Sequence, residues 1–229
     1  VWMEQGSSEY LLGTDELGRD ILTRLIYGGR VTLMMSMVPV GLALLIGSTL
    51  GLVAGYVGGR VNMLIMRVTD VFYAFPSILL AVAISGAMGG GIVTALFSLT
   101  LIFIPPLARI TESITTKIRN EDYVQAARAT GASVFTIIRV HVLSNVLGPV
   151  LIYASSLLSV GIVVASGLSF LGLGVSPPIA DWGLMLNALR EAIYVAPTNA
   201  ALPGVIIFIT CMSFNLLSDS LRSAMDVRL

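Results

Sequence analysis

Charged side chains are scarce in this sequence, and four long stretches lack them altogether. Asp, Glu, Lys and Arg make up 11% of the 229 residues, and the mean hydropathy is +0.92. The stretches without any charge are residues 31–59, 71–108, 140–180 and 192–218. A membrane-spanning helix needs about 20 apolar residues, whereas a surface helix of a soluble domain shows a polar stripe. The composition therefore excludes an ordinary soluble domain and predicts a membrane protein.

Residues with catalytic or metal-binding chemistry are almost as rare. The sequence has one lysine, Lys117, and one histidine, His141. A phosphate-binding loop needs Gly-Lys-Ser/Thr after a glycine-rich turn, and Lys117 has no such turn before it. Tetrahedral zinc takes several nitrogen or sulfur ligands, and a Ser-His-Asp triad needs an orienting acid and an oxyanion hole. We therefore expect no ATP hydrolysis, catalytic residue, cofactor or metal on this chain, and a structural role for His141.

The sequence also lacks the features of a disulfide-bonded protein and of a nucleic-acid-binding protein. The sequence has one cysteine, Cys211, within an apolar stretch, so no intrachain disulfide can form. The formal net charge is zero, which gives no indication of a nucleic-acid surface. We expect Cys211 to be a small packing residue.

The apolar stretches divide into five predicted membrane spans. Three glycines separate the second span from the third, a short charged segment separates the third from the fourth, and a stretch rich in Gly and Pro separates the fourth from the fifth. The spans cover about residues 31–57, 63–87, 92–117, 137–167 and 200–222. We therefore expect an all-α fold, a polytopic bundle of transmembrane helices.

The distribution of basic residues predicts how this bundle is oriented. With five spans, nine of the 13 Lys and Arg residues fall on the side of the charged segment and the C-terminus, and four fall on the other side. Cytoplasmic loops carry the excess of basic residues, so we expect the charged segment and the C-terminus in the cytoplasm. Residues 1–30 and the loop of residues 168–198 then lie outside. Because nothing would carry such an N-terminus across, we expect a sixth span upstream of Val1.

The charged segment, residues 119–133, has an unusual composition for a connector. Residues 121–131 read Glu-Asp-Tyr-Val-Gln-Ala-Ala-Arg-Ala-Thr-Gly. Three alanines keep the side-chain bulk low, so a helix formed here would suit the groove of another protein. The alternative is an ordinary loop that rests on lipid headgroups.

The ends of this segment carry the signals of a short helix. Asn120 is a good N-cap residue, and Glu121 and Asp122 place acids at the positive end of the helix. Gly131 can adopt the left-handed conformation that ends a helix. Ser133 is suited to cap the helix that follows, which becomes the fourth span.

Three motifs occur in the order found in a known family. Residues 12–20 read Leu-Gly-Thr-Asp-Glu-Leu-Gly-Arg-Asp, residues 124–133 contain Gln-Ala-Ala-Arg and Gly-Ala-Ser, and residues 169–174 read Ser-Phe-Leu-Gly-Leu-Gly, followed by Trp182. Together they resemble the permease subunits of ATP-binding-cassette importers of the dipeptide, oligopeptide and nickel group. The resemblance is to the second of the two paired permeases, and it extends from residue 12 to the C-terminus.

In that family the charged segment is the loop that couples the permease to its ATPases. The chain matches the family pattern at Ala126, Ala127, Gly131 and Leu143, and it departs from it at Gln125, His141 and Ser144. The resemblance therefore implies an ATPase-coupling helix. Its residues are Glu121, Asp122, Tyr123, Val124, Gln125, Ala126, Ala127, Arg128, Ala129, Thr130, Gly131 and Ala132.

The resemblance also implies a function and a set of partners. The chain would be the non-catalytic permease of an ATP-driven importer in the inner, cytoplasmic membrane of a prokaryote. It would pair with a homologous permease, two cytoplasmic ATPases that bind ATP-Mg, and an extracytoplasmic solute-binding protein, and would carry small peptides or a related solute such as a nickel chelate.

The alternative is a secondary transporter driven by an ion gradient. Such proteins hold charged or broken-helix ion sites at mid-membrane, and the span centres here lack acids.

The segments outside the membrane offer candidate docking residues. Residues 14–29 have the pattern of an interfacial helix, with Thr14 as its cap and Asp20 and Arg24 four residues apart as an ion pair. Anchoring on the membrane and docking of the binding protein both stay open, for this segment and for the aromatic Trp182. The docking candidates are Asp15, Arg19, Asp20 and Trp182.

Two patterns within the spans bear on packing and gating. Gly47, Gly51 and Gly55 recur every four residues and predict the close approach of a neighbouring helix. Asp70 lies just inside a span, three residues after Arg67. An acid in a membrane is a candidate functional residue with a partner to be named, so the pair either braces the cytoplasmic gate or is a satisfied helix-end ion pair. Prolines occur in every span, and we expect static kinks there.

Overall fold

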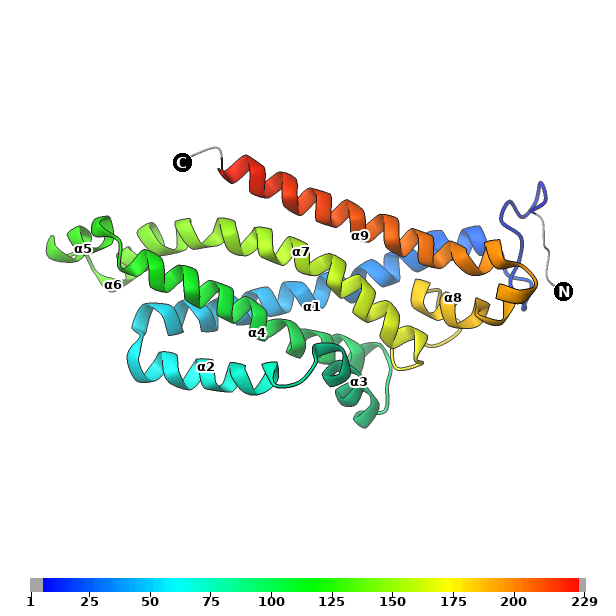
Figure 1. The fold of residues 1–229 in the computed structure, drawn as a ribbon, viewed down its shortest axis with the longest axis horizontal. Helices are drawn as coiled ribbons and strands as arrows, with labels where there is room; N and C mark the ends of the chain where they lie inside the picture. The colour runs from blue at the N-terminus through cyan, green and yellow to red at the C-terminus, as the bar shows by residue number, and fades with distance from the viewer. Residues whose placement is uncertain (1–5, 227–229) are drawn as a thin grey trace. The chain divides into compact units, whose positions relative to one another are not determined.

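The computed structural model describes residues 6–226, and helices dominate them (Figure 1). Among the described residues the only strand-like pairing is an isolated bridge between Thr14 and Asp20. The helices are α1 (Ile21–Val57), α2 (Gly59–Tyr73), α3 (Ser77–Ala87), α4 (Ile92–Arg119), α5 (Asp122–Ala129), α6 (Val134–Thr136), the π-helix η1 (Ile137–Val142), α7 (Leu143–Phe170), α8 (Trp182–Leu189), the 3₁₀ helix η2 (Glu191–Tyr194) and α9 (Pro197–Asp226).

Four helical stretches are long and apolar enough to cross a membrane. They are α1, α4, the continuous stretch of α6, η1 and α7, and α9. The pair α2 and α3 meets the same criterion when the two are taken together, although they are bent by 83° with respect to each other. The predicted all-α transmembrane fold is confirmed, with four spans or five when the bent pair counts as one.

The second predicted span is not a single helix, and that part of the prediction is wrong. The expected helix over residues 63–87 is broken after Tyr73 and resumes at Ser77. Pro76 lies in the break. Proline has no N–H to donate and disfavours the helical conformation of the residue before it, so a sharp change of direction follows. We expected only a static kink at this proline.

The first span begins earlier than expected. Helix α1 starts at Ile21 and runs for 37 residues, so the predicted interfacial helix over residues 14–29 does not exist as a separate element. Thr14 does not cap a helix, because it lies in the bridge with Asp20. Asp20 takes that role instead, since its carboxylate accepts a 2.9 Å hydrogen bond from the backbone N–H of Thr23.

The chain divides into two compact units. The first contains residues 1–39, 78–99 and 158–214, and the second contains residues 40–77, 100–157 and 215–229. A cluster of buried side chains from α1 and α8 lies in the first unit: Ile21, Leu25, Trp182 and Met185. Because the long helices contribute to both units, the units are not sequential domains.

In the second unit, the glycine face of α1 packs closely on α4, as predicted. A methyl group added to Gly51 would lie 2.3 Å from the carbonyl oxygen of Ala108, and one added to Gly55 would lie 2.7 Å from Cβ of Thr115. At Gly47 the nearest atom would be the carbonyl oxygen of Ile104, at 2.8 Å. Distances this short leave room only for hydrogen, so the backbones approach as closely as glycine allows.

Candidate functional site

The charged segment forms a helix of its own, α5, between α4 and α7. Figure 1 shows α5 and α6 together at the point where α4 ends and the next long helix starts. The N-cap residue of α5 is Glu121, with extended backbone (φ −68°, ψ 146°), and not Asn120 as predicted. Asp122 occupies the first turn and Arg128 the last, so both charges are favourable to the helix dipole.

One apolar side chain holds α5 against the rest of the second unit. Val124 is 0% exposed, and it is the buried residue of this helix. Ala127, one turn later on the same side, is half-buried, whereas Gln125, Ala126 and Ala129 are exposed. The period of 3.6 residues therefore separates an anchoring side from a free side of small side chains. The free side is the part of α5 that a partner can reach.

The C-terminal end of α5 is closed by a Schellman motif. Gly131 has a φ of +81°, and its N–H donates to the carbonyl of Arg128 at 3.0 Å. The N–H of Ala132 donates to the carbonyl of Ala127 at 3.1 Å. This is the pair of hydrogen bonds that satisfies the last carbonyls of a helix. The predicted stop at Gly131 is confirmed, and it sets the direction in which the chain leaves α5.

The following helix starts at the predicted cap. The hydroxyl of Ser133 accepts a 3.2 Å hydrogen bond from the backbone N–H of Thr136. Six residues of π-helix, η1, then precede α7. A π-turn is rare and occurs often at functional sites, and no feature that we used in the sequence indicated it.

A polar contact joins α5 to the start of α7. The rings of Tyr123 and His141 lie 6.1 Å apart at 52°. The side-chain amide of Asn145 donates to the carbonyl of His141 at 2.6 Å and to the hydroxyl of Tyr123 at 3.5 Å. Burial, with a smaller effect of the Glu121 carboxylate, raises the pKa of Tyr123, so the phenol stays protonated and neutral. His141 therefore lies in a packing contact.

Two arginines, one on α5 and one at the end of α4, contact the end of α1, and sequence reasoning missed both contacts. The guanidinium of Arg128 lies 5.5 Å from the centre of the Tyr56 ring, and Nη1 of Arg119 donates to the carbonyl of Tyr56 at 3.1 Å. Tyr56 is 72 positions before Arg128, and nothing in either local sequence indicates the pairing. The cation–π contact fixes α5 to the last turn of α1, and the hydrogen bond fixes the end of α4 to the same turn.

A hollow lies beside this contact. Its volume is about 500 Å³, and it is lined by Tyr56, Val57, Arg128, Ala132, Val134, Ile137 and Ile138. The lining combines residues of the charged segment, of η1 and of the end of α1.

The predicted pair of Arg67 and Asp70 is not formed. Asp70 is paired instead with Nη2 of Arg109, on α4. The guanidinium of Arg109 also lies 5.3 Å from the centre of the Tyr73 ring, and Arg67 is exposed. The prediction of a helix-end pair is wrong because it considered only neighbours on α2, and a long arginine side chain reaches Asp70 from another helix.

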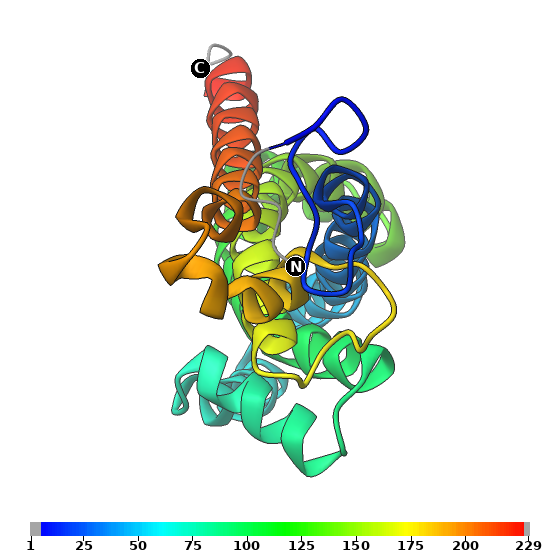
Figure 2. The same cartoon turned by 90° about the vertical axis from the view of Figure 1, so that its right-hand side faces the viewer.

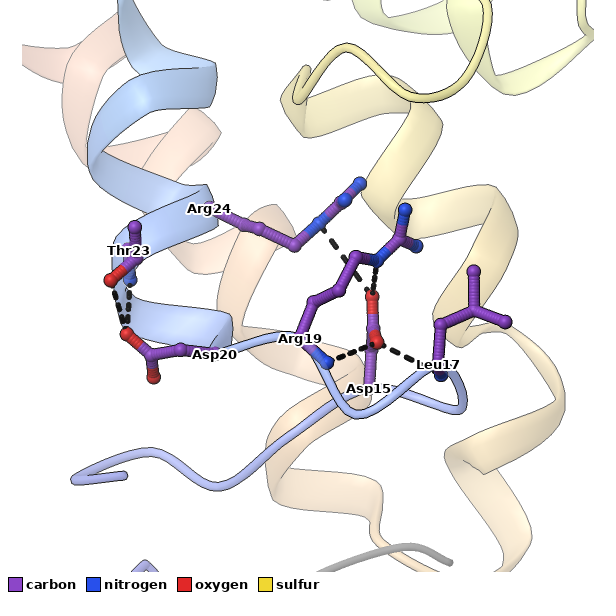
Figure 3. Close-up of polar contacts among 6 residues, drawn as sticks. All are labelled: Asp15, Leu17, Arg19, Asp20, Thr23 and Arg24. Carbon is purple, nitrogen blue, oxygen red and sulfur yellow. Dashed lines mark hydrogen bonds and ion pairs between the residues drawn. The ribbon is translucent and has the colours of Figure 1, made fainter. Parts of the chain in front are cut away.

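Three of the docking candidates, Asp15, Arg19 and Asp20, lie close together at the start of α1 and in the loop before it (Figure 3). The side chain of Asp15 is 8% exposed, and its carboxylate accepts from the N–H groups of Leu17 and Arg19 at 3.0 and 2.9 Å. Nε of Arg19 donates to it at 2.7 Å, and Nε of Arg24 lies 3.7 Å away. The predicted pair of Asp20 and Arg24 is therefore wrong, since Arg24 contacts Asp15.

Trp182 is also a buried anchor. It is 6% exposed, and its indole N–H donates to the carbonyl of Leu25 at 2.8 Å. The preceding residue, Asp181, is 1% exposed, accepts from the hydroxyl of Thr32 at 2.8 Å, and caps α8 through the N–H of Leu184 at 3.0 Å. In Figure 2, the loop before α1 and the region of α8 lie toward the viewer.

Of the four docking candidates, Asp15 and Trp182 are buried, whereas Arg19 and Asp20 are half-buried, with 33% of the Arg19 side chain exposed. Asp15, Asp20 and Trp182 instead hold the loop before α1, the first turn of α1 and α8 in place. The structure thus brings Asp15, Arg19 and Arg24 together and places Trp182 on the side of α1.

Comparison with known proteins gives a match over most of the chain. Residues 47–229 match the family described as "binding-protein-dependent transport system inner membrane component". A glutathione transport system permease protein from Pectobacterium atrosepticum is 40% identical over 226 residues, which cover 99% of this chain and 75% of the relative. A di/tripeptide transport system permease protein from Pseudomonas aeruginosa is 41% identical over 228 residues, which cover 100% of this chain and 75% of the relative.

Solved structures show the same fold at lower identity. A chain of the MetNI methionine ABC transporter, in an inward-facing conformation, aligns with a TM-score of 0.74 and 19% identity, covering 89% of this chain and 97% of that one. A chain of an amino acid ABC transporter with histidines aligns with a TM-score of 0.68 and 18% identity, covering 91% of this chain and 95% of that one.

Proposed function

The chain belongs to the family of inner membrane components of binding-protein-dependent transport systems, and on that footing we propose that it carries short peptides. It is a non-catalytic permease of an ATP-driven importer. The proposal of a peptide solute is supported by relatives named for glutathione and for di- and tripeptides, at about two-fifths identity. Glutathione, dipeptides and tripeptides are all short peptides with charged termini, so a pathway that accepts charged termini suits all of them.

The proposed complex contains a second, homologous permease, two ATPases and a solute-binding protein. ATP-Mg binds to the ATPases, because this chain has no glycine-rich loop before its one lysine, Lys117. The binding protein delivers the solute from outside. The importer interpretation replaces the ion-gradient alternative, since the family depends on a binding protein.

Helix α5 is the proposed site of ATPase docking. The observation that carries this proposal is the division of α5 into one anchoring side at Val124 and one exposed side of small residues. Arg128 contacts Tyr56 of α1, and the Schellman motif at Gly131 closes the C-terminal turn of α5. A short helix that is fixed to the long helices moves together with them when a docked ATPase moves. Its exposed alanines leave room for that ATPase to bind.

The proposed orientation places α5 and the C-terminus in the cytoplasm. The basis is the excess of Lys and Arg on that side, nine of 13, together with the need for α5 to reach cytoplasmic ATPases. Labelling of single cysteines in intact cells by an impermeant thiol reagent tests it, after replacement of Cys211. Position 18, in the loop before α1, should react, and position 125 should not.

The test of docking is the substitution Ala126→Asp. Ala126 is exposed, whereas Ala127 is half-buried beside Val124, so a carboxylate at 126 leaves the chain's own packing intact. Docking would bury this carboxylate without a partner, which is unfavourable. We expect normal amounts of the variant in the membrane, loss of co-purifying ATPase, and dipeptide uptake reduced by about tenfold or more.

Ala224→Asp is the matched control, because Ala224 is an exposed alanine near the end of α9, in the same unit. It should keep the ATPases and the uptake. Wild-type uptake by Ala126→Asp would contradict the docking role of α5.

Uptake of amino acids but not of dialanine, trialanine or glutathione by the wild-type complex would contradict the solute class and leave the docking role standing.

A further inference from the structure

One ion pair within the spans is accessible, and its position is unusual for a membrane protein. The side chains of Asp70 and Arg109 are 46% and 50% exposed. Asp70 comes from α2 and Arg109 from α4, both in the second unit. Tyr73, one turn after Asp70, is 50% exposed and lies under the Arg109 guanidinium. The cluster therefore presents an anion, a cation and an aromatic ring on one side.

The depth of this cluster follows from helix geometry. Helix α4 has 28 residues, which gives it a length of about 42 Å. Arg109 lies ten residues before Arg119, the last residue of α4, and this separation is about 15 Å. The hydrocarbon core of a bilayer is about 30 Å thick. Residues 92–108 of α4 carry no charge, so Arg109 lies at the end of its apolar part, on the side of α5.

The exposed polar residues continue along one side of α4. Arg109, Ser113 and Lys117 are all exposed, and their spacing of four residues places them on one helix face. The opposite side of α4 packs on the glycine face of α1 through Ala108 and Thr115. An ion pair at the end of the apolar part, continued by a polar stripe, faces water or protein at lower free energy than lipid.

A second acid, Glu112 on α4, has a structural role and serves as a comparison. Glu112 is half-buried, and its carboxylate accepts from the amide of Asn62 at 2.5 Å and from the hydroxyl of Thr116 at 3.1 Å. The Asn62 amide also lies 3.3 Å from the carbonyl of Ala54. Glu112 is thus enclosed by its own neighbours. Asp70 and Arg109 differ because half of each side chain is open.

We propose that Asp70, Arg109 and Tyr73 form a solute-binding site in the transport pathway, for short peptides with free, charged termini. Asp70 takes the ammonium group of the solute, and Arg109 takes its carboxylate in a two-pronged hydrogen bond. Tyr73 contributes a cation–π contact to the ammonium group. This site rests on the proposed peptide solute. Without solute, the two side chains neutralise each other, and the long Arg109 side chain moves aside when a zwitterion enters.

This arrangement suits a transporter better than a tight binding pocket. Binding breaks the one resident ion pair and forms two ion pairs with the solute, and release of the solute restores the resident pair. The site therefore neither traps the peptide nor leaves a lone charge in the membrane after release. A permease that must release its solute needs such a balance.

The test replaces the charges and keeps the shapes, in the variant Asp70→Asn with Arg109→Gln. A pair with only a structural role should tolerate this change, because neutral residues of similar shape often replace an ion pair without loss of stability. We expect normal assembly of the full complex in proteoliposomes and uptake of radiolabelled dialanine reduced by about tenfold or more. Arg67→Gln is the matched control, since Arg67 is an exposed arginine one turn before Asp70, and should change uptake by less than about twofold.

The outcomes separate this inference from the proposed function. If the wild-type complex takes up dialanine and the neutral variant does so equally well, the site is wrong and the peptide solute stands. If the wild-type complex takes up no peptide, both are wrong. Uptake reduced by Arg67→Gln as much as by the neutral variant would show a general effect of charge and overturn the site.

A second measurement tests the site even if the neutral variant does not assemble. Tyr73→Cys, with Cys211→Ser, keeps both charges and places a thiol in the cluster. A charged, membrane-impermeant thiol reagent should label position 73 in the assembled complex, and most of the labelling should be lost during turnover with dialanine and loaded binding protein. No labelling, or labelling that dialanine does not affect, would overturn the site.

Discussion

Two polar regions of the molecule, both predicted to meet partners, differ in what their side chains contact. Around Asp15 and Asp181, in the first unit, the carboxylates are nearly buried and each accepts at least two hydrogen bonds from nearby groups. On α5, in the second unit, the charged and small side chains are exposed, and Val124 is the buried anchor. The first region, which we call the framework, holds the loop before α1, the start of α1 and α8 together. The second region is an exposed surface.

The difference follows from the energetics of burial. A buried carboxylate without partners is strongly unfavourable, so Asp15 and Asp181 are found where N–H groups and hydroxyls converge on them. An exposed alanine has no such requirement and leaves a helix free to meet another protein. Residue type therefore indicated polar chemistry in both regions, and burial decided that Asp15 and Asp181 are engaged within the unit whereas the small side chains of α5 are available to a partner.

The largest expected effect comes from breaking the framework with Asp181→Ala. This change removes the cap of α8 and leaves the hydroxyl of Thr32 without its acceptor, which together should cost about 2–4 kcal/mol of folding free energy. We expect a clearly lower melting temperature of the detergent-purified protein. Glu191→Ala is the control, because the Glu191 side chain is 77% exposed. An unchanged melting temperature for Asp181→Ala would show that the framework does not stabilise the first unit.

A smaller effect is expected at the end of α5. Gly131 has a φ of +81°, a conformation that costs a residue with a side chain about 1–2 kcal/mol. Gly131→Val should lower peptide uptake at nearly normal membrane levels, because the loop leaves α5 in a different direction. Gly131→Asn should keep most of the uptake, since Asn tolerates this conformation. Equal uptake by all three proteins would show that the direction of the loop is unimportant for coupling.

The smallest effect concerns the start of α1 and depends on pH. The hydrogen bond from the Thr23 hydroxyl holds the pKa of Asp20 below its ordinary value of 3.8, although burial acts in the opposite direction. A depressed pKa means that the ionised group stabilises the fold above pH 3.8, and that this contribution is lost as the pH falls through the lower, folded-state pKa.

Asp20→Asn tests this prediction, because Asn is also a good cap but does not ionise. The melting temperature of the wild type should exceed that of the variant at pH 6, and the difference should shrink toward pH 3. A difference that is independent of pH would assign the effect of Asp20 to shape and not to charge.

The membrane helices were predictable because their cause is local. A run of about 20 apolar residues suffices for a span whatever surrounds it, and the runs that contain α4, α7 and α9 show it clearly. The stop of α5 at Gly131 and the cap at Ser133 were predictable for the same reason. The break after Tyr73 and the early start of α1 were not, since proline is often tolerated within a membrane helix and charges at a helix start do not prevent helix formation.

The partners of the charged residues were the least predictable part. Spacing of three or four residues suggested Arg67 with Asp70 and Asp20 with Arg24, and the structure pairs Asp70 with Arg109 and Arg24 with Asp15. An arginine side chain is long enough to reach a neighbouring helix or loop, so adjacency in the folded chain overrides adjacency in sequence.

The amino-acid sequence by itself determined that this is a helical membrane protein, where α5 lies in the chain, and how that helix ends, because hydrophobicity, helix caps and glycine conformation act over a few residues. Only the tertiary structure decided that Trp182 and Asp15 face inward, that Val124 anchors α5, and that Asp70 meets Arg109. The physical reason is that burial and ion pairing depend on which helices pack together, and that choice involves residues tens of positions apart.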